Sequence, residues 1–199
     1  MVIVNKPGGL LAVPGRGPNK QDCVSTRLQK IFPQMIAQPS VHRLDMFTSG
    51  LMVYAIKKDV HRHLSMQFEA RKVEKKYEAL VEGLITQTRG EIQLPFRLDP
   101  ENRPIQIYDP DKGKLGITLW AKISEETNST RIEFTPLTGR THQLRVHAAH
   151  ARGLGRPIIG DSLYGSGKDG EQMMLHATLL RFTHPTSGET MQFFSQPPF

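Results

Sequence analysis

The sequence lacks the residues and segments on which several classes of protein depend. Its 199 residues include one cysteine, Cys23, so neither an internal disulfide nor a zinc site built from cysteines can form. No stretch is long and apolar enough to span a bilayer, and the N-terminus turns polar after four residues, as a signal peptide would not. These absences predict a protein of a reducing, cytoplasmic compartment.

Motifs for metals and for nucleotide phosphates are missing too. His61 and His63 are two residues apart on a predicted helix and His142 and His147 are five apart, so neither pair shares a helix face, and no HExxH occurs. The stretch GRGPNK, residues 15–20, is rich in glycine but lacks the GK[ST] ending of a P-loop, and its proline removes a backbone amide. We therefore expect no metal site, and a flexible basic loop at this stretch.

What the sequence does contain is an excess of positive charge. Lysine and arginine number 26 against 19 acidic residues, which gives a net charge of +7. This balance fits a nucleic-acid binder, although a basic soluble protein with no special partner has the same composition. The length suits one domain, with or without two lobes, and is ample for a hydrophobic core.

Apolar patterns and turn residues predict more strands than helices. Asp22 is expected to cap the first helix and Thr141 the last. Because the elements do not alternate as a βαβα series, we expect an α+β fold with a mixed, mostly antiparallel sheet and flanking helices. The predicted strands are 2–4, 51–56, 76–81, 91–96, 116–123 and 130–135, with two further apolar runs near the C-terminus, and the predicted helices are 22–32, 59–70 and 142–151.

Three stretches carry candidate functional residues. VHRLDMFTSGLMVYA, residues 41–55, places Arg43 and Asp45 before a buried strand, although such an aspartate could also only shape a turn. PLTGRTHQLRVH, residues 136–147, places Arg140 at a turn before a helix, where a weak surface salt bridge is the alternative. RKVEKKY combines four cations with Tyr77, a pattern that also suits a solvated helix end.

Together these stretches resemble the RluA-type pseudouridine synthases. The motifs HRLD-x-x-TSG-L, K-x-Y and TGR-x-HQLRVH match, as do VNKPGG, IIGDSLYG and MLHATLLRFTHP, which reads Met174 where a leucine is usual. The likeness runs from residue 2 almost to the end, in the expected order. It implies the pseudouridine synthase fold with a central catalytic cleft, in a single catalytic domain spanning 1–199 with no S4 domain. Family members usually have another strand and an acidic turn before VNKPGG, which here would precede Met1.

The resemblance also implies an activity. The family isomerises uridine to pseudouridine in RNA, without a metal or an organic cofactor. The VPGR loop and NRPIQ are similar to a branch that modifies large-subunit ribosomal RNA and tRNA anticodon stem-loops. The expected partner is therefore rRNA, tRNA or both, and the expected oligomeric state is a monomer.

By resemblance, Asp45 is the catalytic carboxylate. It could attack C1′ of the ribose, attack C6 of the base or take a proton from C2′, and the sequence does not choose among these. Burial disfavours an ionised carboxylate, and the family position of Arg140 would oppose that effect through a paired guanidinium. Tyr77 matches the residue that stacks on the extruded uracil, and Arg43 matches one that fills the gap left in the RNA.

The remaining expectations concern neighbours and rivals of this site. His42 and Leu44 are expected to pack or to shape the loop. A non-catalytic RNA-binding module is one rival interpretation, and a hydrolase is a weaker one because no G-x-S-x-G motif occurs. The expected phosphate contacts are Arg16, Lys20, Arg71, Lys75 and Lys76.

Overall fold

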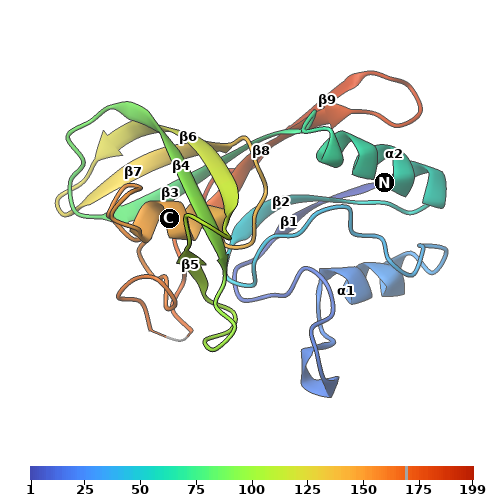
Figure 1. Ribbon diagram of the computed structural model, residues 1–199. Coiled ribbons are helices and arrows are strands. Elements are labelled where there is room, and N and C mark those ends of the chain that lie inside the picture. The colour runs from blue at the N-terminus through green and yellow to red at the C-terminus, as the bar shows by residue number, and fades with distance from the viewer. Residues whose placement is uncertain (169) are drawn as a thin grey trace. The chain divides into compact units, whose positions relative to one another are not determined.

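The computed structural model describes residues 1–168 and 170–199, and the contacts in it divide the chain into two compact units (Figure 1). Unit 1 comprises residues 1–75 and 176–198, and unit 2 comprises residues 76–175 together with Phe199. The described residues form nine strands, three α-helices and one 3₁₀ turn, η1 (Pro18–Lys20). The predicted α+β class is confirmed, whereas the single catalytic domain stays a prediction.

The strands of unit 1 pair in the order β1-β2-β8, and β9 pairs with β8 outside this order. β1 and β2 pair antiparallel, as do β8 and β9, while β2 and β8 run parallel, with Ser49 beside His176 and Gly50 beside Ala177. Gly50 has φ +112°, and a side chain there would fall on the Ala177 backbone. The elements of this unit are β1 (Val2–Lys6), α1 (Val24–Ile31), β2 (Ser49–Tyr54), α2 (Lys58–Glu69), β8 (Leu175–Thr183) and β9 (Thr190–Phe194).

One apolar core cluster of unit 1 lies between this sheet and α2. All six residues of β2 are buried, as its unbroken apolar run predicted. Gln67 on α2 donates to the carbonyl oxygen of Thr183 at 2.8 Å and accepts from the Thr183 amide at 2.8 Å, so the helix is fixed to β8. The buried apolar cluster consists of Leu51, Val53, Leu64, Val73, Leu180 and Phe182.

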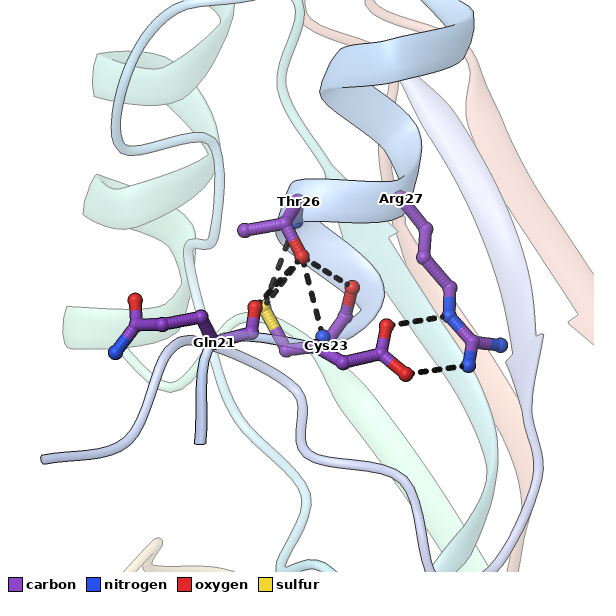
Figure 2. A network of polar contacts seen from close by, with 5 residues as sticks. Gln21, Cys23, Thr26 and Arg27 are labelled. Atoms are coloured by element: carbon purple, nitrogen blue, oxygen red, sulfur yellow. Dashed lines mark hydrogen bonds and ion pairs between the residues drawn. The ribbon is translucent and has the colours of Figure 1, made fainter. Parts of the chain in front are cut away.

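The start of α1 differs from the prediction by one residue. Figure 2 shows that Cys23, rather than Asp22, caps this helix: its Sγ accepts from the Thr26 amide at 3.5 Å, and its own amide donates to Thr26 Oγ1 at 3.1 Å. Asp22 instead accepts two hydrogen bonds from the guanidinium of Arg27, at 2.8 and 2.7 Å. The prediction was wrong because the buried cysteine begins the helix and the aspartate lies one position outside it.

Unit 2 holds an antiparallel sheet in the order β3-β7-β6-β4-β5 and one helix. The predicted cap Thr141 is wrong, because α3 begins from His142, which has the left-handed φ of 56°. Unit 2 is built from β3 (Glu74–Glu82), β4 (Arg89–Leu98), β5 (Gln106–Tyr108), β6 (Lys114–Glu125), β7 (Ser129–Pro136) and α3 (Gln143–Ala149). Among the described residues, no helix is both long and apolar enough to cross a membrane.

Candidate active site

The loop before β2 is anchored by His42. Its ring stacks on Phe68 with centroids 4.5 Å apart, and its Nε2 accepts from the Val53 amide at 3.1 Å. Burial lowers the pKa of His42 to about 3, and the nearby charge of Lys75 adds to that effect. The histidine is therefore neutral near pH 7 and serves as a fixed support, and Leu44 is buried beside it in the chain. The predicted packing role of both residues is confirmed.

Arg43 and Asp45 alternate with these buried residues. Arg43 is exposed, Asp45 is half-buried, and Leu44 between them is 7% exposed. The backbone after Asp45 turns back at once, because the Thr48 amide donates to the Asp45 carbonyl oxygen at 3.2 Å. The loop thus presents a guanidinium and a carboxylate from a segment whose alternate side chains are fixed in the core.

Lys6 interacts electrostatically with Asp45 within unit 1. Its side chain is fully buried, and its Nζ donates to the carbonyl oxygens of Pro7 at 2.8 Å, Leu10 at 2.8 Å and Met46 at 2.9 Å. Burial lowers the pKa of Lys6 to about 8, and the negative charge of Asp45 opposes this shift. This lysine belongs to the VNKPGG motif, but the sequence predicted no role for it. The available signal was a lysine that follows a short apolar strand and precedes a proline.

A buried histidine holds the other end of the loop. His176 Nδ1 lies 2.8 Å from Ser49 Oγ, and its Nε2 lies 2.9 Å from Ser195 Oγ. Burial lowers the pKa of His176 to about 4, so the ring is neutral near pH 7, with one nitrogen donating and the other accepting. The first residue of β2 is therefore linked through one ring to the segment that follows β9.

In unit 2, the turn that carries Arg140 is built around Gln143. The Gln143 side chain is 4% exposed, and its Oε1 accepts from the Arg140 amide at 3.0 Å and from the Thr138 hydroxyl at 2.7 Å. Its Nε2 donates to the Ile117 carbonyl oxygen at 3.0 Å and to Thr118 Oγ1 at 2.9 Å. Since the amide is fully used, the turn is held tightly, and Arg140 extends from it as an exposed side chain.

Tyr77 lies on β3 opposite Phe134 of β7 and is half-buried, whereas Phe134 is fully buried. The neighbouring Lys76 forms an ion pair with Glu133 at 2.9 Å. This pair engages one of the cations that the sequence suggested for RNA phosphates.

The IIGDSLYG motif supports α3. Asp161 is 1% exposed and accepts from Arg145 Nε at 2.8 Å and from Arg145 Nη2 at 2.6 Å. The same carboxylate accepts from the amides of Leu163 at 2.9 Å and Tyr164 at 3.1 Å. The buried pair thus fixes the loop to the helix that follows Arg140, and sequence reasoning had assigned no role to it.

The predicted site residues fall in both units. Arg43 and Asp45 belong to unit 1, and Tyr77 and Arg140 belong to unit 2. Arg16, Lys20 and Arg71 are exposed, while Lys75 lies 5.9 Å from the centre of the Phe68 ring. No three His, Cys, Asp or Glu side chains within residues 1–168 and 170–199 gather where they could hold a metal ion.

Comparison with known proteins identifies the class. The model of the RNA pseudouridylate synthase family matches residues 1–150, so the chain belongs to that family. It is therefore an isomerase that forms pseudouridine in RNA.

Its relatives narrow the class further, and the RluA-type resemblance is confirmed. The dual-specificity RNA pseudouridine synthase RluA of Yersinia pestis is 43% identical over 203 residues, covering 100% of this chain and 96% of the relative. RluA of Escherichia coli K12 is 41% identical and is covered over 90% of its length. The solved structure of human RNA pseudouridylate synthase domain containing 1 has a TM-score of 0.77 at 30% identity, covering 99% of this chain and 80% of that one.

Proposed function

We propose that this enzyme isomerises uridines in large-subunit ribosomal RNA, in tRNA anticodon stem-loops or in both, with Asp45 as its catalytic carboxylate. The observation that carries the proposal is the loop from residue 42 to residue 48. It presents Asp45 beside a charged, fully buried Lys6 and fixes the residues on both sides of it. A carboxylate that must meet one atom of a nucleoside needs such a rigid base.

The reaction breaks the bond from N1 of uracil to C1′ and forms one from C5 to C1′. The hydrogen on C5 leaves as a proton and N1 gains one, so substrate and product have the same composition. Attack at C1′, attack at C6 and proton removal from C2′ all require Asp45 to be ionised. The negative charge of Asp45 acts on the buried Lys6, where it opposes the lowering of the lysine pKa by burial.

The other site residues hold the target nucleotide. Extruding the uridine costs about a few kcal/mol, which contacts with the protein must offset. In this proposal Tyr77 stacks on the extruded uracil, Arg43 fills the gap that the uridine leaves in the RNA, and Arg140 supports Asp45. These roles rest on motif positions, and the exposed guanidinium of Arg43 and the rigid turn of Arg140 suit them.

The RNA backbone is bound by exposed cations of the same chain. The net charge of +7, with Arg16, Lys20 and Arg71 exposed, supports this assignment. Affinity for RNA should then fall steeply as salt rises, because phosphate contacts release counterions. We further propose a monomeric cytoplasmic enzyme that needs neither metal nor organic cofactor.

The deciding experiment measures tritium release from RNA labelled at C5 of uridine, with a chelator present. We expect release by the native enzyme and none by Asp45→Asn, while RNA binding survives. The matched control is Asp59→Asn, because Asp59 is an exposed aspartate in the first turn of α2. Equal release by native enzyme and Asp45→Asn would remove Asp45 from the mechanism. An RNA-binding module without catalysis would release no tritium even as the native chain.

A further inference from the structure

Unit 1 contains a cavity beside Arg43 that the proposed mechanism does not use. Its volume is about 630 Å³, and its walls come from the Val13–Pro14 loop, from Ser25 and Gln29 on α1, and from residues 37–43. Pockets that bind small molecules have volumes of about 300–1,000 Å³. The cavity is therefore large enough for one nucleotide.

The walls are held in place by the protein itself. The Gln29 amide donates to the carbonyl oxygens of Ile36 at 3.1 Å and Ala37 at 3.0 Å, which ties α1 to the facing loop. On the same side, the Ser25 hydroxyl donates to the Ala12 carbonyl oxygen at 3.1 Å. Since these donors are engaged without a ligand, the cavity is preformed.

The chemistry of the lining suits a nucleobase. Val13, Pro14 and Val41 supply apolar surface for a flat ring, and no lining residue is acidic, so a phosphate is tolerated. The exposed side chains of Gln38 and Arg43 make no hydrogen bond to other described residues and can donate to base or phosphate oxygens. Apolar walls with a few convergent polar donors are typical of sites for such ligands.

Neighbouring charges favour a nucleotide of an RNA strand over a free small molecule. Arg16 and Lys20 are exposed in the loop that continues from Pro14. The charge of Lys75 reaches His42, which also lines the cavity. A polyanionic backbone that enters and leaves the cavity would meet these cations.

We propose that this cavity is a second nucleotide subsite, which binds an unstacked base near the target uridine, with Arg43 at its edge. Arg43 is two residues from Asp45, and two residues span at most about 7 Å. The base bound there therefore belongs to a near neighbour of the target in the same strand. This inference rests on the proposed function and adds a source of site selectivity to it.

The first test fills the cavity. Ala37 lines it and is exposed, so Ala37→Trp should fold normally and occupy the space that a base would take. We expect the KM for substrate RNA to rise about tenfold or more, while kcat on bound RNA is kept. Ala37→Ser, which leaves the cavity open, is the matched control. If the tryptophan and serine variants have the same KM, the subsite does not exist.

The second test identifies the nucleotide. RNAs that each lack one base near the target are compared with native enzyme and with Ala37→Trp. At the position whose base enters the cavity, removing the base should raise the KM of the native enzyme. The same RNA should not raise the KM of Ala37→Trp any further, because the missing base and the tryptophan each abolish the same contact. If, at every position, the KM increase from base removal and the KM increase from Ala37→Trp multiply, the two changes act independently and the proposal is overturned. A native enzyme that releases no tritium from any RNA would instead refute the proposed function.

Discussion

Replacing Lys6 with methionine tests the role of a buried ammonium group that donates three hydrogen bonds. The substitution keeps the length of the side chain but removes the ammonium that opposes the charge of Asp45. It also leaves three inward carbonyl oxygens without their donor, those of Pro7, Leu10 and Met46.

Two opposing contributions set the expected loss of stability. A hydrogen bond to a charged group contributes about 1.5–3 kcal/mol, and Lys6 makes three of them. Against this, its pKa of about 8 instead of 10.5 means that burying the charge costs about 3 kcal/mol. We therefore expect Lys6→Met to lower the free energy of unfolding by about 1.5–6 kcal/mol, measured by urea denaturation at pH 7.

The pH dependence separates the structural effect from the catalytic one. Because the folded pKa of Lys6 lies below the unfolded value, the unfolded chain binds the extra proton between pH 8 and about 10.4. The contribution of Lys6 to stability thus rises with pH across that window, and the full cost of burying the charge is present below pH 8. Activity should instead fall as the pH rises across the same window, since Asp45 loses its cationic neighbour as Lys6 deprotonates.

The assay is the rate of tritium release from C5-labelled RNA between pH 6 and 10. Native enzyme should lose kcat above about pH 8, whereas Lys6→Met should be slow at pH 7 and show no further alkaline loss. Lys30→Met is the control, because Lys30 is exposed on α1. Native stability and an unchanged pH profile in Lys6→Met would refute the reasoning.

Three further predictions concern stability and loop position. Gly50→Ala should cost more than about 3 kcal/mol in urea denaturation, because φ is +112° and the new methyl group would meet the Ala177 backbone; a loss below about 1 kcal/mol would contradict this. Asp161→Asn should cost about 3–5 kcal/mol, since the buried guanidinium of Arg145 would lose the charge of this carboxylate, and an unchanged melting temperature would disprove that. His176→Ala should lower kcat about tenfold with an unchanged KM for RNA. The native enzyme should lose stability as the pH falls from 6.5 to 4, because only the unfolded chain binds a proton at this ring in that range, and His176→Ala should lack this loss. An equal loss of stability in both proteins would argue against the prediction.

Much of the fold was predictable because local patterns and tertiary structure agree. The apolar run at residues 51–56 predicted a buried strand, and β2 (Ser49–Tyr54) is buried along its whole length. β5 escaped prediction because its three residues are too few to show a period of two. The start of α3 escaped it because His142 adopts a left-handed conformation that no residue-type preference indicates.

The candidate site divides in the same way. Motifs predicted Arg43, Asp45, Tyr77 and Arg140 as site residues, because a resemblance carries positions along the sequence. Their supports could not be identified, since each depends on contacts between distant segments. Lys6 is 40 residues from the carbonyl oxygen of Met46 to which it donates, and His176 is 127 residues from Ser49.

The composition of the units has a consequence for how the chain folds during synthesis. Unit 2 occupies one continuous stretch apart from Phe199, so it can complete nearly all its contacts once residue 175 has left the ribosome. Unit 1 begins earlier in the chain but lacks β8 and β9 until residues 176–198 emerge. Until then β2 has no parallel strand with which to pair. In a nascent polypeptide we therefore expect unit 2 to be able to fold before unit 1, in which β2 gains its parallel neighbour only when β8 has emerged.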